Sequence, residues 1–268
     1  MRDRYAVVGN PVAHSKSPEI HALFARQTAE AIEYTRILAP LDGFEDTVRR
    51  FVREGGRGLN VTVPFKFDAF RLATERTPRA ETAGAVNTLR FDGNQILGDN
   101  TDGAGLVADI TRNLGIGLAD ARILMLGAGG AAYGVMLPLL DQKPAVLHIA
   151  NRTPEKAASL ADAFARYGRT SSSGYDTLEG RYDVIINATS AGLQDTMPDV
   201  SATVFGQGSL ALDMVYADKP TAFMQFAAGQ GARVRDGFGM LVEQAAESFS
   251  VWRGVRPETA PVFAHFGR

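Results

Sequence analysis

The stretch RILMLGAGGAAYGVMLPLL, which runs from Arg122 to Leu140, decides the fold of this chain. It begins with large apolar residues, turns through closely spaced glycines and continues as an apolar segment of helical length. A buried parallel strand followed by a tight turn and a buried helix gives such a continuous apolar pattern. The turn fits the pattern G-x-G-x-x-A over the residues Gly127, Ala128, Gly129, Gly130, Ala131 and Ala132.

This glycine turn predicts a dinucleotide-binding site. The first glycine permits the turn, Gly129 lets the backbone approach a pyrophosphate, and the small Ala132 lets helix and strand pack closely. The free N–H groups and the dipole at the helix N-terminus favour an anion there. A glycine turn that only packs remains the alternative. The part of this stretch from Ile123 to Leu140 also carries no charge and is near the length of a membrane span, but its glycines and Pro138 favour strand, turn and helix.

The residues after the next strand predict which dinucleotide binds. An NAD site usually has an acidic residue about 20 positions after the turn, where it holds the ribose 2′-hydroxyl. Here the strand ends at Asn151, Arg152 and Thr153, with no acid. Arg152 and Thr153 can bind a 2′-phosphate instead, and Lys156 is a second possible phosphate contact. The sequence therefore favours NADP, although Arg152 as a surface residue in a turn and Lys156 as a solvated helix charge stay open.

Strands and helices alternate on both sides of this unit, which predicts an α/β fold. Apolar runs predict strands near residues 5–8, 34–38, 59–63, 122–126, 145–150, 184–186 and 210–214, and Asp92-Gly93 predicts a hairpin. Helices are expected near 44–54, 103–113, 129–140, 154–166 and 240–253, and one opened by Ser17 as N-cap and Pro18. We expect a substrate-binding α/β domain over residues 1–101, a doubly wound parallel Rossmann domain over 102–237, and C-terminal helices over 238–268 that return to the first domain.

Composition narrows the function classes. The 268 residues carry 28 basic and 30 acidic side chains, a net charge of -2, which gives no support to a nucleic-acid or membrane partner. Cysteine is absent, which excludes disulfides, thiolate metal sites and a cysteine nucleophile. No two of the four histidines stand four residues apart, so no histidine metal site is expected. No signal peptide is visible, and a cytoplasmic protein is expected.

Short polar motifs along nearly the whole chain resemble one family, shikimate dehydrogenase. They are GNPVAHSKSP at 9–18, NVTVPFK at 60–66, GAVNT at 84–88, GDNTDG at 98–103, the glycine turn, NRT at 151–153, NATS at 187–190 and GMLVEQ at 239–244. Each motif is moderately specific, and their common order makes a chance match very unlikely. The resemblance is greatest to the NADP-dependent biosynthetic type.

That resemblance implies a substrate domain, a Rossmann domain and a cleft between them. It also implies reversible, NADPH-linked reduction of 3-dehydroshikimate to shikimate, a step of chorismate and aromatic amino acid biosynthesis, by a monomer or homodimer. A quinate/shikimate dehydrogenase that uses NAD is an alternative, against which the missing acid at Asn151 speaks. A non-catalytic NADPH-binding sensor is another, against which intact Lys66 and Asp102 speak.

The resemblance also implies the roles of individual residues. Lys66 and Asp102 match the catalytic pair, although a solvated lysine and a helix N-cap are the structural alternatives. Lys66 stands between Phe65 and Phe67, where a partly desolvated ammonium suits acid–base work. The remaining matches are Ser15 and Ser17 for the substrate carboxylate, Thr62 and Asn87 for ring hydroxyls, Tyr216 near the substrate, and Thr189, Met214 and Gly237 for the cofactor.

Gln244 has a further argument of its own. It falls on the same helical face as Leu241, Ala245 and Phe249, and an inward amide needs hydrogen-bond partners. A substrate hydroxyl or backbone atoms can supply them. Two departures from the family pattern, Pro78 and the loop Ala217-Asp218-Lys219-Pro220, leave the local geometry of those loops open.

Overall fold

The computed structural model describes residues 2–189, 191 and 196–268, so Ser190 of the NATS motif lies outside the described residues. By spatial proximity the chain divides into two units, which are Met1–Gly105 with Leu241–Arg268, and Leu106–Met240. The finer domain boundaries at 101/102 and 237/238 stay predictions.

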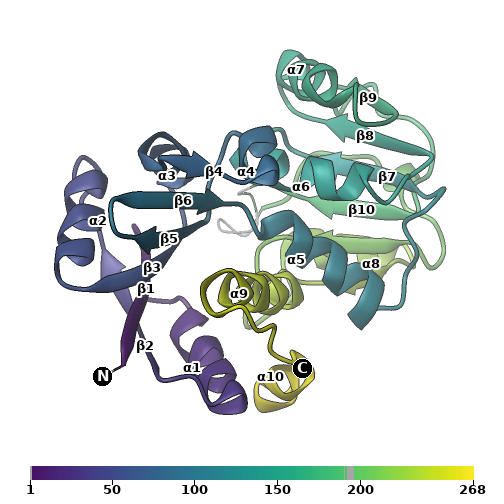
Figure 1. Cartoon of the computed structure of the whole chain (residues 1–268). Helices are drawn as coiled ribbons and strands as arrows, with labels where there is room; N and C mark the ends of the chain where they lie inside the picture. Colours follow the sequence, from purple (N-terminus) through teal and green to yellow (C-terminus); the bar gives the residue numbers. More distant parts are fainter. Residues whose placement is uncertain (1, 190, 192–195) are drawn as a thin grey trace. The chain divides into compact units, whose positions relative to one another are not determined.

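The first unit contains a mixed sheet (Figure 1) with the order β2-β1-β3-β5-β6-β4. Its strands are β1 (Asp3–Gly9), β2 (Ile32–Leu38), β3 (Gly56–Val61), β4 (Glu75–Arg76), β5 (Thr88–Asp92) and β6 (Gln95–Asp99). β1 pairs in parallel with β2 and β3, and β5 pairs antiparallel with β3 and β6. The predicted hairpin turn has Gly93 at a φ of +57°, a left-handed conformation that glycine adopts without strain.

Helices cover both faces of this sheet. They are α1 (Ser17–Thr28), α2 (Phe44–Arg53), α3 (Lys66–Leu72), α4 (Pro78–Ala83), α9 (Phe238–Arg253) and α10 (Ala260–His265). On one face Phe24 of α1 packs edge-on against Phe249 of α9, with ring centroids 5.9 Å apart. On the other face Phe44, Val48 and Phe51 of α2 pack against the strands in a buried cluster. Each fully buried side chain of this kind stabilises the unit by about 1.5–3 kcal/mol.

The second unit contains an all-parallel sheet with the order β12-β11-β10-β7-β8-β9. Its strands are β7 (Arg122–Leu126), β8 (Val146–Ala150), β9 (Thr170–Ser173), β10 (Val184–Asn187), β11 (Leu210–Asp213) and β12 (Arg233–Arg235). Its helices include α6 (Gly130–Leu140), α7 (Pro154–Phe164) and α8 (Ala222–Gly229), with a short 3₁₀ helix at Ala202–Val204. This strand order is that of the doubly wound Rossmann fold.

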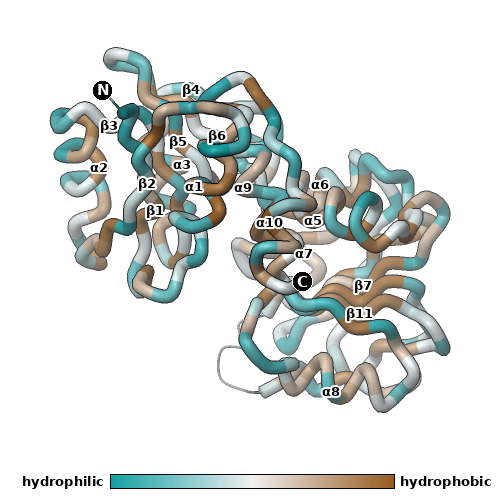
Figure 2. The backbone as a smooth tube through the Cα atoms, turned by 90° about the horizontal axis from the view of Figure 1, so that it is seen from below, coloured by the Kyte–Doolittle hydropathy of each residue, from teal (hydrophilic) through white to brown (hydrophobic). Residues whose placement is uncertain are grey.

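Apolar side chains from alternate positions of these strands fill a core on each face. Ile123 and Met125 of β7 face the cluster under α6 and α7, whereas Leu124 and Leu126 face the cluster under α8. The hydrophobic colour of β7 and β11 in Figure 2 marks these doubly covered strands. The uncharged stretch from Ile123 to Leu140 is therefore a strand, a turn and a helix, as predicted. Within the described part of the chain, no helix is both long and apolar enough to cross a membrane.

Some expectations about elements were wrong. The single helix expected over 103–113 is α5 (Asp102–Ala108) followed by a π-helical turn, Asp109–Asn113. The elements α3, α4, α8, β4, β9 and β12 were not predicted. Pro78 fits the structure well, because it opens α4 next to its N-cap Thr77, whose hydroxyl accepts from the N–H of Ala80.

Candidate active site

Lys66 and Asp102 form an ion pair in the first unit. Lys66 begins α3, five residues after β3 ends, and Asp102 begins α5 after β6. Their Nζ and Oδ2 atoms lie 2.6 Å apart, and the side chains are 21% and 9% exposed. The N–H of Asp102 donates to the Oδ1 atom of Asn100 at 3.1 Å, so the helix cap comes from Asn100 and leaves the Asp102 carboxylate for Lys66.

The aromatic surroundings expected for Lys66 are not formed. Phe65 turns into the core and stacks on Phe44, with ring centroids 5.0 Å apart, while Phe67 is 47% exposed. The ammonium is held by the carboxylate of Asp102 rather than set between two rings. Successive side chains at a helix start point in different directions around the helix axis, so sequence neighbours need not be in contact.

A buried hydrogen-bond network fixes the second oxygen of the Asp102 carboxylate. The Nδ2 atom of Asn87 donates to Asp102 Oδ1 at 2.9 Å. The Oδ1 atom of Asn87 accepts from the backbone N–H of Thr101 at 2.9 Å and from the hydroxyl of Thr88 at 2.9 Å. Because a backbone N–H can only donate, it sets which end of the Asn87 amide faces Asp102. Thr88 and Thr101 lie inside the motifs GAVNT and GDNTDG, but no role for either follows from the sequence.

Gln244 joins the same network from α9. Its side chain is 8% exposed, and its Oε1 atom accepts from Asn87 at 3.4 Å and from the Thr101 hydroxyl at 3.3 Å. Its Nε2 atom donates to the carbonyl of Leu241 at 3.0 Å. The structure thus brings Lys66, Asp102, Asn87 and Gln244 together, and the inward amide of Gln244 has the partners that its burial requires.

Ser15 and Ser17 are both buried before and at the start of α1. The Ser15 hydroxyl donates to Ser17 Oγ at 3.2 Å and accepts from the Ser17 N–H at 3.3 Å. The expectation that Ser17 is the N-cap was wrong, because Ser17 is the first helical residue and Lys16 is the capping position without a side-chain bond. The carbonyl of Ser15 accepts two bonds from Arg36, at 3.0 and 2.6 Å, which fix this turn.

Two further predicted substrate residues lie in different surroundings. Thr62 follows β3, and its methyl group lies over Gly9, where a built Cβ would come within 2.3 Å of it. Tyr216 follows β11 in the second unit and is half-buried. Tyr216 therefore belongs to the second unit, whereas the hydrogen-bond network of Lys66, Asp102, Asn87 and Gln244 belongs to the first.

The glycine turn of the second unit has the geometry that a pyrophosphate needs. Gly127 has a φ of +103°, and a Cβ there would lie 2.9 Å from Thr189 Cγ2. Gly129 is the N-cap of α6, and a Cβ on it would meet no atom within 4 Å. The position beside Gly129, at the start of α6, is thus free of other protein atoms, as an anion site requires. Ala128, Gly130 and Ala131 are its neighbours in the turn.

The carboxyl end of β8 carries accessible cations and no acid. Asn151 follows β8, and its Nδ2 atom donates to the carbonyl of Thr153 at 3.0 Å, which shapes the turn before α7. Arg152, Thr153 and Lys156 are exposed. These residues fit a phosphate on the 2′ position of the adenosine ribose, as NADP has and NAD lacks.

Thr189, Met214 and Gly237 lie after the ends of β10, β11 and β12. The N–H of Met214 donates to the carbonyl of Asn187 at 3.0 Å, and the N–H of Gly237 donates to the carbonyl of Val215 at 3.0 Å. A Cβ on Gly237 would lie 2.2 Å from the Met214 carbonyl oxygen, so only glycine fits there. The three predicted cofactor residues therefore all lie at the carboxyl ends of the parallel strands.

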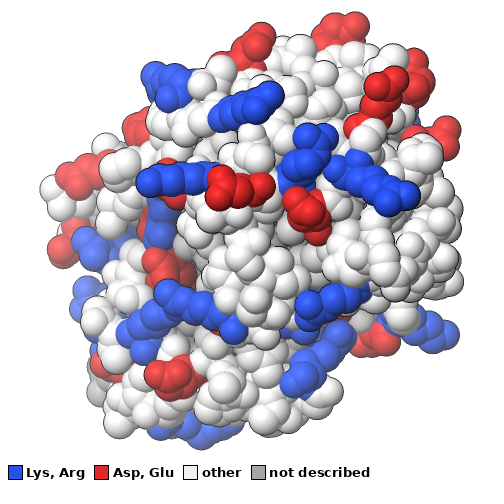
Figure 3. Space-filling model, turned by 90° about the vertical axis from the view of Figure 1, so that its right-hand side faces the viewer, with Lys and Arg blue, Asp and Glu red and all other residues white. Residues whose placement is uncertain are grey.

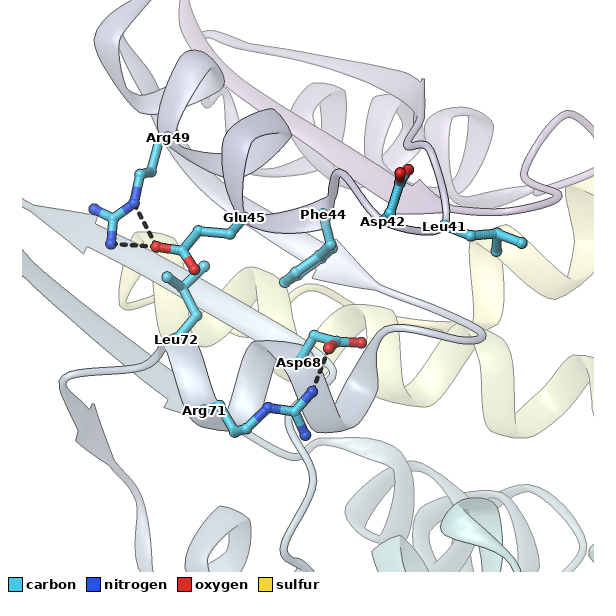
Figure 4. A pocket seen from close by; sticks show the side chains of 8 residues that line it. All are labelled: Leu41, Asp42, Phe44, Glu45, Arg49, Asp68, Arg71 and Leu72. Carbon is cyan, nitrogen blue, oxygen red and sulfur yellow. Dashed lines mark hydrogen bonds and ion pairs between the residues drawn. The ribbon is translucent and has the colours of Figure 1, made fainter.

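A separate hollow of about 470 Å³ lies between α2 and α3 (Figure 4) and contains none of these residues. Its two arginines are already paired, Arg49 with Glu45 at 2.6 Å and Arg71 with Asp68. Such paired charges offer no free cation to a ligand. On the face drawn in Figure 3, basic and acidic side chains are interspersed.

A parallel sheet with a glycine turn in the second unit, and a partly buried lysine–aspartate pair in the first, fit the class of NADP-dependent oxidoreductases. Family models agree with this class. Residues 7–89 match the shikimate dehydrogenase substrate binding domain, residues 109–196 match shikimate / quinate 5-dehydrogenase, and residues 237–262 match the shikimate 5'-dehydrogenase C-terminal domain.

Relatives of known identity and solved structures give the same result. A shikimate dehydrogenase (NADP(+)) from Herminiimonas arsenicoxydans is 61% identical over 98% of this chain and 97% of its own length. An Ael1 enzyme from Pseudomonas putida is 48% identical, with a TM-score of 0.93 over 98% and 97% of the two chains. A shikimate 5-dehydrogenase from Thermus thermophilus, solved with NADP(H) and shikimate, is 32% identical, with a TM-score of 0.85 over 96% of each chain. The chain belongs to the shikimate dehydrogenase family.

Proposed function

We propose that the chain catalyses the reversible, NADPH-dependent reduction of 3-dehydroshikimate to shikimate. The relative from Herminiimonas arsenicoxydans carries that activity in its name at 61% identity. The observation that carries the mechanism is the contact of 2.6 Å between Lys66 and Asp102, with the other carboxylate oxygen held by Asn87. This arrangement presents an ammonium in a fixed position at a buried polar site.

NADP supplies or accepts the hydride when it is bound. The residues of the first unit manage the proton on the substrate oxygen. In the reducing direction the C3 carbonyl oxygen gains negative charge, and Lys66 donates a proton to it as general acid. In the reverse direction Lys66 accepts that proton. The Asp102 carboxylate is held by Asn87 as well as by Lys66, so it keeps the Lys66 side chain in place between turnovers.

The substrate carboxylate has a candidate position at the start of α1. The hydroxyls of Ser15 and Ser17 lie 3.2 Å apart at the start of this helix, whose first residue is Ser17. A carboxylate there gains two hydroxyl donors and the favourable helix dipole. Thr62, Asn87 and Gln244 remain proposed partners of the ring hydroxyls, and Tyr216 remains a proposed neighbour from the second unit.

Turnover of shikimate with NADP⁺, followed at the nicotinamide absorbance band, tests this proposal. Parallel assays with quinate and with NAD⁺ measure the specificity. We expect shikimate with NADP⁺ to give the highest kcat/KM, because Arg152 recognises the 2′-phosphate. Higher kcat/KM with quinate and NAD⁺ would assign the chain to the quinate reaction, and NADP⁺ binding without turnover would make it a sensor.

A further inference from the structure

The order of the strands in the parallel sheet indicates where each half of the cofactor binds. The inference drawn from this order rests on the proposed function. The pyrophosphate belongs at the glycine turn after β7. Arg152, which we propose to hold the adenosine phosphate, follows β8 on one side of β7. The strands β10 and β11 lie on the other side. Because ligands of such sheets bind beyond the carboxyl ends of the strands, the nicotinamide half lies over the ends of β10 and β11.

A buried asparagine ends β10 at this place. The Oδ1 atom of Asn187 accepts from the N–H of Thr189 at 3.2 Å and from its hydroxyl at 2.7 Å. Since the backbone N–H can only donate, the amide oxygen must face Thr189. The amide nitrogen then faces the other way and donates to Asp213 Oδ2 at 3.2 Å.

A buried carboxylate ends β11 and receives that nitrogen. Asp213 is 0% exposed. Besides Asn187, it accepts from the hydroxyl of Thr221 at 2.7 Å and from the N–H of Val215 at 3.0 Å. Burial raises the pKa of the Asp213 carboxyl, and its hydrogen bonds act against that effect. Every contact of this carboxylate that is described here therefore uses it as an acceptor.

The turns at Thr189 and Met214, which the Asp213 carboxylate holds through hydrogen bonds, have little room to shift. Thr189 lies against Gly127 of the pyrophosphate turn, where a Cβ would come within 2.9 Å of its methyl group. Met214 lies against Gly237, where a Cβ would come within 2.2 Å of its carbonyl oxygen. A rotation of the Asn187 amide or of the Val215 peptide must therefore move Thr189 or Met214, which lie at the carboxyl ends of the strands where the cofactor is proposed to bind.

We propose that Asp213 and Asn187 are positioning residues for the nicotinamide half of the cofactor. Asp213 orients the Asn187 amide, and that amide fixes Thr189. Asp213 also fixes the turn of Met214 through Val215. Neither Asp213 nor Asn187 touches the cofactor in this proposal; they set the position of the residues that do.

The substitution Asp213→Asn tests this arrangement with almost no change in size. It replaces one carboxylate oxygen by an NH₂ group, which then faces either the Asn187 amide or the Val215 N–H. If it faces Asn187, that amide rotates and presents its own NH₂ group to the N–H of Thr189. If it faces Val215, two donors meet and the Met214 turn shifts. Both results disturb the carboxyl ends of these strands.

The binding of two probes separates positioning from general damage. NADP⁺ contains the nicotinamide, and 2′,5′-ADP contains only the adenosine phosphates. We expect Asp213→Asn to raise the Kd of NADP⁺ about tenfold or more, and to leave the Kd of 2′,5′-ADP and the KM of shikimate unchanged. Thr221→Val removes one of the three donors and should act in the same direction more weakly, whereas Thr221→Ser keeps the hydroxyl and should restore wild-type binding.

Ser209→Ala is the matched structural control. Ser209 is buried at the opposite, amino end of β11, where its hydroxyl donates to the Gly206 carbonyl at 2.9 Å. This variant should melt at a lower temperature and bind NADP⁺ normally. The proposal is overturned if Asp213→Asn melts lower but binds NADP⁺ like the wild type, or if it weakens NADP⁺ and 2′,5′-ADP equally. A wild-type chain that does not bind NADP⁺ would instead refute the proposed function.

Discussion

His21 is a buried histidine without a hydrogen bond to either ring nitrogen among the described residues. It stacks on Tyr34 at a centroid distance of 4.2 Å. Burial lowers the pKa of His21 to about 3, far below the usual 6.5. The folded state therefore keeps the imidazole neutral, while the unfolded chain can protonate it.

The difference in the pKa of His21 between the folded and the unfolded state predicts that the free energy of unfolding depends on pH in the acid range. Between pH 6.5 and 3 the unfolded state binds more protons than the folded state at His21, so the free energy of unfolding falls as the pH is lowered through this range. The loss between pH 7 and pH 5 amounts to about 2 kcal/mol from this residue. Urea unfolding of wild type and His21→Phe at pH 7 and pH 5 measures it, and the variant should lose that part of the pH dependence. The same dependence in both proteins would exclude His21 as its source, and His265→Gln, an exposed histidine, serves as the control.

Arg152 should determine the choice between NADP⁺ and NAD⁺. Its exposed guanidinium follows β8 at the place where an NAD site has an acid. Arg152→Ala should weaken NADP⁺ binding by about 1.5–3 kcal/mol, the range of a hydrogen bond to a charged group. NAD⁺ binding should stay the same, because NAD⁺ has no 2′-phosphate. Titration of both cofactors measures this, and equal losses would show that Arg152 supports the fold only.

At the scale of the element, the two serines at the start of α1 are expected to determine the KM for shikimate. The double variant Ser15→Ala with Ser17→Ala removes both hydroxyls at the start of this helix. Each bond to a bound carboxylate is worth about 1.5–3 kcal/mol, so the KM for shikimate should rise strongly, while the Kd of NADP⁺ stays unchanged. The melting temperature is measured alongside. A normal KM with a lower melting temperature would make both serines structural.

The elements also show which parts of the fold the sequence could predict. β7 and α6 were predictable, because burial on both faces leaves a continuous apolar run around the glycine turn. β9 was not predictable, because its serines give no apolar alternation. This edge strand is instead held by pairing with β8 and by His148, whose ring nitrogens lie 2.8 and 2.9 Å from the hydroxyls of Ser171 and Ser173.

The candidate site likewise has residues whose positions could be predicted from the sequence and residues whose positions could not. The inward direction of Gln244 followed from its helical face, and the structure confirms that its amide is buried and hydrogen-bonded. The roles of Thr88, Thr101 and Asp213 did not follow, because they depend on contacts between residues that are far apart in the chain. A motif can mark such residues, but only the folded backbone shows which donor meets which acceptor.

At the scale of the whole molecule, each unit has a separate task in the proposed reaction. The first unit holds the proton-transfer pair and the proposed carboxylate position, and the second holds the glycine turn and Arg152. Changes in one unit should therefore affect one ligand at a time, whereas loss of the proton donor should stop turnover with both ligands still bound.

The turnover number of Lys66→Ala tests this account most directly. With saturating shikimate and NADP⁺, kcat should fall about 10²-fold or more, the usual contribution of a general acid–base group, while the Kd of NADP⁺ and the KM of shikimate change little. Arg71→Ala, which removes the exposed cation at the other end of α3, should keep the wild-type kcat. A near-normal kcat for Lys66→Ala would contradict the account, because proton transfer would then not depend on Lys66.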